Sequence, residues 1–301
     1  MWTDFDFHQL THFLAVAKAG NLTRAAHDLG ISQPALSRSI QKLEEKIGEP
    51  LFERLPRGMK LTEIGIFLQT RAKQIRQLVD NTFAQLNEAT NQGQIKLAVI
   101  PTIAPYLLPK ILKKFTQKHP EIKIQVHEDT TENIIQYCKD GEIDIAIVAL
   151  PIAEKDLHFE TLFDEELLLV VPKGHSLEKK EKIHLTDIQE FPFISLHQQH
   201  CLSDNIAEYC SRKSVAPVSV EHTNQLATIQ ELVALQHGIS ILPAMAQQVD
   251  KTKLRTYRSF AGEKPSRTIA LLQNPKRYEH HSVLLFKKYM KESKLKLRHF
   301  I

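Results

Sequence analysis

The sequence predicts a multidomain α/β protein, because its pattern changes twice along the 301 residues. Residues 1–62 combine short helical periods with a basic hairpin segment, and residues 63–92 continue as one long helical repeat. Residues 93–301 alternate strand and helix patterns, as a mainly parallel α/β layer requires. A chain of this length exceeds one ordinary hydrophobic core. We therefore expect two separate domains joined by a linker helix.

The composition indicates a soluble globular protein, with 42% hydrophobic and 25% charged residues. Three cysteines cannot form a disulfide framework, so we expect the reducing environment of the cytoplasm. The first residues do not resemble a signal peptide, and no apolar run approaches the roughly 20 residues of a membrane span. We expect no membrane association.

Positive charge is concentrated near the N-terminus. The net charge is only +4, but residues 18–76 carry eleven basic and six acidic side chains. A basic domain of this kind permits nucleic acid as a partner.

Three helices are expected in this basic region, at 7–19, 22–29 and 33–47. Asn21 and Ser32 precede the second and third helices and have the chemistry of N-caps. A short helix, a tight turn and a longer helix form a helix-turn-helix, whose second helix can enter the major groove of DNA.

The third helix has one apolar stripe and one polar face. Polar and basic side chains on that face suit base-edge and phosphate contacts; the candidates are Gln33, Ser37, Arg38 and Lys42. The alternative is a solvated polar face on an ordinary three-helix bundle.

The following segment, LFERLPRGMKLTEIG, suggests a β-hairpin wing that places Arg54 and Arg57 near phosphates. From AAHDLGISQPALSRS through this wing, about forty contiguous residues resemble the winged helix-turn-helix of LysR-type transcriptional regulators. The resemblance implies that Gln33, Pro34, Ser37 and Arg38 lie at double-stranded operator DNA, with Arg54 and Arg57 in support. RNA polymerase is a further candidate partner.

A heptad seam follows in the linker helix, at Leu68, Ala72, Ile75, Val79, Thr82 and Leu86. A seam without a partner in its own chain favours pairing with a second chain. The alternative is packing on the winged domain. The LysR resemblance implies a homodimer through this helix, built up to a tetramer.

Strands are expected near 94–100, 122–127, 143–150, 167–171, 193–196, 218–221, 239–242 and 267–273, and helices near 106–118, 131–139, 204–212, 224–236 and 280–292. This order resembles the periplasmic-binding-protein-like effector domain of LysR-type regulators. The resemblance implies a first lobe from 93–163 and 267–301, a second lobe from 164–266, and a ligand between them.

The segment HCLSDNIAEYC contains two of the three cysteines, Cys201 and Cys210. A helix start at Ser203 or Asp204 would place Cys201 beside a positive helix end and a charged His200. Both would lower the pKa of the Cys201 thiol. On a continuous helix the two cysteines would be roughly 13 Å apart and on opposite faces. From the residues alone, inert packing, a redox pair and a zinc site with His200 all remain open.

The cysteine segment also resembles the OxyR-like, peroxide-sensing branch of the LysR family, supported by the stretches IPTIAPYLLP, HEDTTENI and SRTIALL. The resemblance implies that Cys201 reacts with peroxide and Cys210 resolves the product. It implies a pocket formed by Thr102, Thr131, His200, Asp204 and Arg267. Two residues depart from the pattern, because Gln199 replaces a glycine and Ser203 replaces an arginine, which removes a positive charge near the thiol.

The expected function is therefore a cytoplasmic LysR-type regulator that senses hydrogen peroxide through a Cys201–Cys210 switch. The alternative is a LysR-type regulator that binds a small organic metabolite between its lobes, with inert cysteines. An enzyme is not expected, since no acid–base or nucleophile–base pair and no nucleotide-binding motif can be assembled. No cofactor and no metal site are expected.

Overall fold

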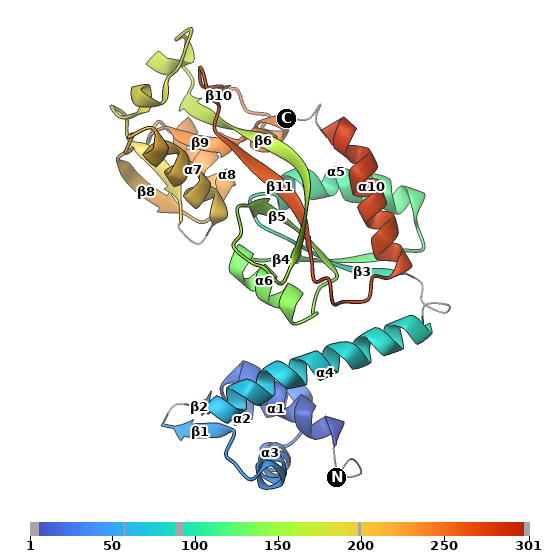
Figure 1. Cartoon of the computed structure of the whole chain (residues 1–301). Coiled ribbons are helices and arrows are strands. Elements are labelled where there is room, and N and C mark those ends of the chain that lie inside the picture. Colours follow the sequence, from blue (N-terminus) through green and yellow to red (C-terminus); the bar gives the residue numbers. More distant parts are fainter. Residues whose placement is uncertain (1–5, 57, 88–92, 198–199, 298–301) are drawn as a thin grey trace. The chain divides into compact units, whose positions relative to one another are not determined.

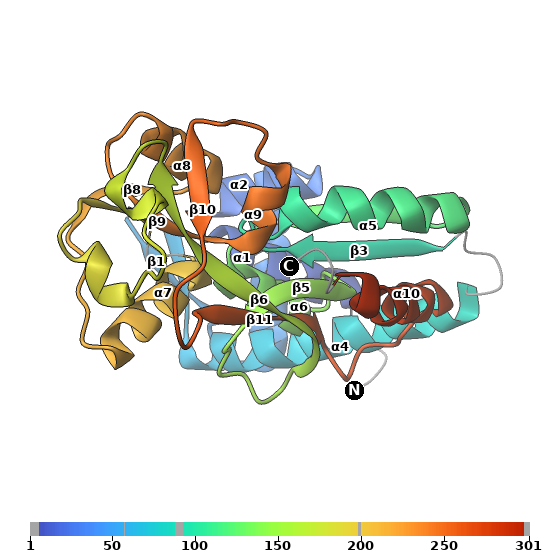
Figure 2. The ribbon, with the colours of Figure 1, turned by 90° about the horizontal axis from the view of Figure 1, so that it is seen from above.

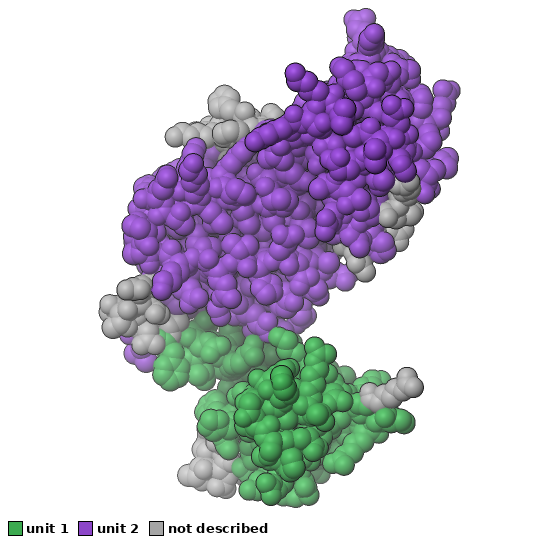
Figure 3. Space-filling model, turned by 180° about the vertical axis from the view of Figure 1, so that it is seen from behind, with its two compact units in different colours: residues 1–83 green, residues 84–301 purple. Residues whose placement is uncertain are grey.

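The computed structural model of the chain describes residues 6–56, 58–87, 93–197 and 200–297. It divides into two compact units, Met1–Phe83 and Ala84–Ile301 (Figure 3). We call these the N-terminal and C-terminal units. The long helix α4 continues across the division between them.

The N-terminal unit contains three helices, a two-stranded hairpin and most of a fourth helix (Figure 1). The elements are α1 (Phe7–Ala19), α2 (Leu22–Leu29), α3 (Gln33–Ile47), β1 (Phe52–Leu55), β2 (Gly58–Leu61) and α4 (Glu63–Asn87). The two expected N-caps are confirmed: Asn21 accepts a hydrogen bond from the Arg24 amide, and Ser32 accepts one from the Ala35 amide. The helix-turn-helix thus begins and ends where its local signals place it.

The core of the N-terminal unit joins α1, α3 and the hairpin. Phe13 and Leu36 are fully buried in it, and the rings of Phe13 and Phe52 lie 5.3 Å apart. The hairpin is held against the end of α1, where the Met59 amide donates to the Gly20 carbonyl at 2.8 Å. A side chain at position 58 would clash with that carbonyl, so Gly58 is required for the close approach.

The apolar seam of α4 is only partly free for a second chain, which differs from the expectation. Ala72 is fully buried, and Leu68 and Ile75 pack against the core of the N-terminal unit. This half of the heptad pattern is therefore satisfied within the chain itself. Leu86, at the other end of the pattern, is 71% exposed.

The C-terminal unit is a mixed α/β structure. Its elements are β3 (Gln94–Val99), α5 (Ala104–Lys118), β4 (Lys123–Glu128), α6 (Thr131–Lys139), β5 (Ile145–Leu150), β6 (His158–Pro172), β7 (Phe193–Leu196), α7 (Cys201–Arg212), β8 (Ser219–Thr223), α8 (Leu226–Ala234), β9 (Ser240–Pro243), α9 (Ala244–Val249), β10 (Arg255–Arg258), β11 (Ser266–Gln273) and α10 (His281–Leu297). Two short 3₁₀ helices, Ser176–Glu178 and Leu185–Ile188, lie between β6 and β7.

One long strand connects two groups of elements (Figures 1 and 2). The sheet order is β10-β6-β11-β5-β3-β4, with β9 also paired to β6. The first part of β6 pairs with β11, and its last part pairs with β9 and β10. We call β3–β5, α5, α6, β11 and α10 the first lobe, and β7–β10 with α7–α9 the second lobe.

Helices cover this framework on both sides of the sheet. In the first lobe, α5 and α10 lie side by side (Figure 1). The rings of Phe115 and Phe286 lie 5.1 Å apart, edge to face, between these helices. In the second lobe, β7 pairs in parallel with β8 and bridges to Ile239 just before β9. The alternating α/β pattern is confirmed.

Three differences from the sequence expectation affect the site. The strand expected at 167–171 extends over fifteen residues, from His158 to Pro172. The helix expected at 204–212 begins at Cys201, with His200 as its N-cap. The short elements α9 and β10 were missed. Among the described residues, no helix is long and apolar enough to cross a membrane.

Candidate functional site

The outer face of α3 forms the candidate nucleic-acid interface. Leu36, Ile40 and Leu43 are buried, which turns the opposite face of the helix away from the core. Gln33, Pro34, Arg38 and Lys42 are exposed there and Ser37 is half-buried, so the structure brings all five together. Arg54 is exposed on β1, whereas Arg57 lies outside the described residues.

The candidate sensing site is assembled at the N-terminus of α7. Cys201 is the first residue of this helix rather than a residue before it, and part of its side chain remains accessible. Thr131, the first residue of α6, forms a side-chain hydrogen bond with Cys201. The site thus joins the starts of two helices from different lobes.

Arg267 is the central charge of the site, and its side chain is fully buried. Its Nη1 donates to the Thr102 hydroxyl at 2.8 Å, and its Nη2 donates to the Thr102 carbonyl at 3.1 Å. Its Nε donates to Glu165 Oε2 at 2.9 Å. Because Arg267 faces Glu165 across the β11–β6 ladder, the backbone register itself creates this ion pair.

Glu165 was missed by the sequence analysis. Its side chain is fully buried, and its Oε1 accepts a hydrogen bond from the Met245 amide at the start of α9. A signal was present, because strand side chains alternate and Glu165 shares its face with buried Phe163 and Leu167. A carboxylate on a buried strand face needs a cationic partner.

The electrostatics at Cys201 correct the expected direction of its pKa. Burial raises the pKa of the Cys201 thiol, and Asp204 acts in the same direction. Arg267 and the Thr131 hydrogen bond oppose this increase without overcoming it. The structure thus places Asp204 within electrostatic reach of the thiol, although its side chain is exposed.

His200 does not supply the expected imidazolium. Burial lowers the pKa of its ring, and the neighbouring His197 lowers it further. The ring also forms a hydrogen bond with the backbone of Asn224, just before α8. His200 is therefore neutral near pH 7, and Arg267 is the positive charge that acts on Cys201.

This arrangement predicts how the reactivity of Cys201 depends on pH. Only the thiolate is nucleophilic, and a pKa above the ordinary value of about 8.5 keeps that form scarce at pH 7. Alkylation of Cys201 by iodoacetamide should rise about tenfold per pH unit between roughly pH 6 and 8. Peptide mass spectrometry measures the rate. A rate that is constant above roughly pH 6 would show a lowered pKa and contradict this account.

Cys210 lies near the other end of α7, in a different environment. It is buried, and burial raises the pKa of its thiol to about 11. Nine residues of helix separate it from Cys201 by roughly 13 Å, whereas a disulfide needs Cα atoms about 4.4–6.8 Å apart. Both cysteines are free, and α7 must unwind before they can bond.

Two further observations in this unit concern the third cysteine, Cys138, and the possibility of a zinc site. Cys138 is a buried core residue of α6, and burial raises the pKa of its thiol to about 12. Within the described ranges, no three histidine, cysteine or acidic side chains form a group that could hold a metal ion.

An exposed helix-turn-helix face in one unit and a buried polar site in a second, two-lobed unit indicate the class of DNA-binding transcription regulators. Residues 7–66 match the family described as bacterial regulatory helix-turn-helix protein, lysR family, and residues 88–294 match the LysR substrate binding domain. The chain belongs to the LysR family. It is accordingly a DNA-binding regulator and not an enzyme.

Individual relatives support the same family. A probable hydrogen peroxide-inducible genes activator from Streptomyces viridosporus is 36% identical, over 87% of this chain and 86% of the relative. The DNA-binding transcriptional dual regulator OxyR of Escherichia coli is 30% identical, over 90% of each chain. A solved full-length OxyR variant from Pseudomonas aeruginosa is 25% identical and covers 95% of each chain, with a TM-score of 0.77.

Proposed function

We propose that this protein is a cytoplasmic, homo-oligomeric regulator that senses hydrogen peroxide through a reversible Cys201–Cys210 disulfide, which changes its contacts with operator DNA. The observation that carries the proposal is the position of Cys201 beside Arg267 and Thr131, on the same helix as a second free thiol. The names of the relatives from Streptomyces viridosporus and Escherichia coli support peroxide as the stimulus.

The site supplies the chemistry of this reaction. The Cys201 thiolate attacks one peroxide oxygen, the O–O bond breaks, and the sulfur becomes a sulfenic acid while the leaving hydroxide takes a proton and departs as water. Arg267 favours the thiolate by its charge, and the Thr131 hydrogen bond adds to this effect. Thr102 orients the guanidinium. Attack by the Cys210 thiol then forms the disulfide and releases a second water.

The geometry turns this chemistry into a conformational switch. The disulfide cannot form while α7 is intact, so oxidation selects a state in which the helix has unwound. A covalent bond formed in one state biases a two-state element. We propose that this change reaches the DNA-binding units through the oligomer.

A metabolite-sensing function receives less support from the site. A buried arginine could bind a metabolite carboxylate only with free donors. Arg267 already directs three of its five N–H donors to Glu165 and Thr102, which leaves two for such a carboxylate.

The DNA-binding part of the proposal is tested at Arg38. Arg38→Ala should weaken operator binding by about 1–3 kcal/mol if its guanidinium contacts a base. A gel-shift titration with an operator selected from random duplexes measures this change. Arg24→Ala, which removes a basic residue of α2 at the same net charge, is the matched control and should have a smaller effect. Unchanged affinity of Arg38→Ala would remove this residue from the interface.

The oligomeric state is tested at the exposed apolar side chains of α4. Phe67, Leu78, Phe83 and Leu86 are each more than 60% exposed, which is unusual for large apolar residues on a helix of a monomer. We expect at least a dimer by light scattering at micromolar concentration. Leu78→Glu together with Phe83→Glu should yield monomers, and a monomeric mass for the unmodified protein would refute the proposed assembly.

A further inference from the structure

A cavity of about 140 Å³ lies beneath α7 in the second lobe, away from the Cys201 site. Its walls come from α7, α8, β7 and β9, and from the chain that leads into β8. The central lining residues are apolar and buried: Leu196, Leu202, Leu226, Ile229, Ile241 and Leu242. The cavity therefore lies in the apolar core of the lobe, and one side of it opens towards the surface.

The hydroxyl groups around this cavity already form hydrogen bonds. Ser240 donates to the Ile194 carbonyl at 2.7 Å, and Ser203 donates to the Leu196 carbonyl at 3.2 Å. The hydroxyls of Ser195 and Ser219 bond to each other at 2.7 Å. A guest would gain little from polar atoms there, because these groups already have partners. The lining thus favours an apolar guest.

The size of the cavity defines that guest further. A cavity of roughly 150 Å³ lined by leucine, isoleucine and phenylalanine remains dry and takes up benzene in another protein. The cavity beneath α7 has nearly this volume and a lining of the same kind. Its guest would be a single aromatic ring or an aliphatic group of similar size.

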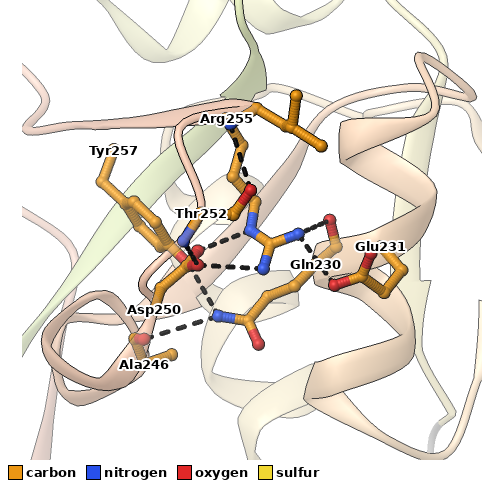
Figure 4. Close-up of polar contacts among 8 residues, drawn as sticks. Gln230, Glu231, Ala246, Asp250, Thr252, Arg255 and Tyr257 are labelled. Carbon is orange, nitrogen blue, oxygen red and sulfur yellow. Dashed lines mark hydrogen bonds and ion pairs between the residues drawn. The ribbon is translucent and has the colours of Figure 1, made fainter.

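The α8 wall of the cavity is fixed by a polar network around Gln230, in the middle of that helix (Figure 4). Gln230, next to Ile229 of the cavity wall, donates to the Tyr257 hydroxyl at 2.6 Å. Arg255 donates to the Gln230 carbonyl at 2.6 Å and forms a buried ion pair with Asp250. Tyr257 donates to the same Asp250 at 2.7 Å. These bonds tie α8 to β10 and to the residue that follows α9.

The α7 wall has no such buried ion pair among the described residues, although the Tyr209 hydroxyl donates to the Glu263 carbonyl at 2.7 Å. The ammonium of Lys213, just after the helix, pairs with Glu263 at 2.6 Å in an exposed ion pair, which contributes little to stability. Asn205 donates to the Leu150 carbonyl at 3.3 Å, but its own buried side-chain oxygen has no hydrogen-bond partner. The movable wall of the cavity is therefore the helix that carries both cysteines.

We propose that this cavity binds one small apolar molecule, such as a monocyclic arene, and that the bound molecule holds α7 in its helical, reduced state. The cavity exists only while α7 is docked, because Leu202, Ile206 and Cys210 of that helix form one wall. A ligand that binds only one of two states stabilises that state by mass action.

The consequence for the redox cycle rests on the proposed peroxide-sensing function. Oxidation of Cys201 by peroxide to a sulfenic acid and water takes place on the opposite face of α7, so the guest leaves this step unchanged. Attack by Cys210, which forms the disulfide and releases water, requires α7 to unwind and is slowed. With the guest at ten times its dissociation constant, the second step should slow about elevenfold.

The binding site is tested with fluorobenzene and the reduced full-length protein, by fluorine NMR titration without peroxide. Saturable binding is expected for the unmodified protein. It should be lost in Ile206→Phe, which fills the cavity, and in Ala207→Leu, which narrows its mouth at an exposed position. Ser211→Leu lies on α7 outside the cavity lining and should bind normally. No saturable binding, or equal binding in both filled variants, would overturn the proposal.

The effect on the switch is measured separately, with fluorobenzene present or absent. Dimedone trapping after peroxide should show the same rate of sulfenic acid formation at Cys201, while the Cys201–Cys210 disulfide forms more slowly. An unchanged rate of disulfide formation with a saturated cavity would contradict the regulatory role. If no disulfide forms without the probe, the peroxide-sensing proposal fails, and the NMR titration still decides whether the cavity binds its guest.

Discussion

Arg267→Met should lower the free energy of unfolding by about 3–5 kcal/mol, because it leaves Glu165 as a buried charge without its partner. Both side chains of the ion pair are fully buried, so water cannot replace the lost contact. The Thr102 hydroxyl and carbonyl also lose their donors. Urea denaturation at pH 7, monitored by circular dichroism, measures the change in the C-terminal unit.

Two further variants test whether the lower free energy of unfolding comes from the unpaired buried charge of Glu165 or simply from the removal of a cation. The double variant Glu165→Gln/Arg267→Met removes both charges but keeps an oxygen for the Met245 amide, so most of the stability should return. Lys264→Met breaks a more exposed ion pair with Glu166 and should cost less than about 1 kcal/mol. Equal decreases in the free energy of unfolding for Arg267→Met and Lys264→Met would contradict the claim that the buried ion pair accounts for the effect.

Sequence signals such as helix caps predicted those helices and strands whose ends are set by residues adjacent in the chain. Asn21 and Ser32 cap the helices that their positions indicated, and the segments 131–139 and 193–196 have the predicted bounds. The strand β6 was only partly predicted, because its first half is rich in charged and partly exposed residues. Pairing with β11, a hundred residues further along the chain, makes that half a strand.

The periodicity of α4 shows a second limit of sequence patterns. A regular apolar seam predicts that one face of a helix is covered, but it does not say by what. In the structure, Leu68, Ala72 and Ile75 face the core of their own unit. The exposed Phe67 and Leu78 lie outside the predicted seam.

The sensing site was predicted from resemblance, because its residues are far apart in the chain. Thr102 and Arg267 are separated by 165 positions, and only the fold brings them together. The expected lowering of the Cys201 pKa, with a charged His200 beside it, was wrong, because sequence context shows the charged neighbours but not the burial that opposes them. Glu165 was detectable, since it occupies a buried position in an alternating strand.

Replacing Cys201 should have the largest effect on function. With a serine at this position there is no thiolate to attack peroxide, and no sulfenic acid for Cys210 to resolve. Cys138→Ser is the matched control, because the Cys138 thiol is buried and its pKa is raised to about 12. Cys201→Ser should abolish disulfide formation, whereas Cys138→Ser should form the bond like the unmodified protein.

The most direct test of the central claim is peptide mass spectrometry of the full-length protein after stoichiometric hydrogen peroxide, with free thiols blocked. We expect a Cys201–Cys210 linked peptide in the unmodified protein and in Cys138→Ser, and none in Cys201→Ser. The bond should disappear on reduction, as a reversible switch requires. Two free thiols after peroxide, or overoxidation of Cys201 without a disulfide, would contradict the redox switch.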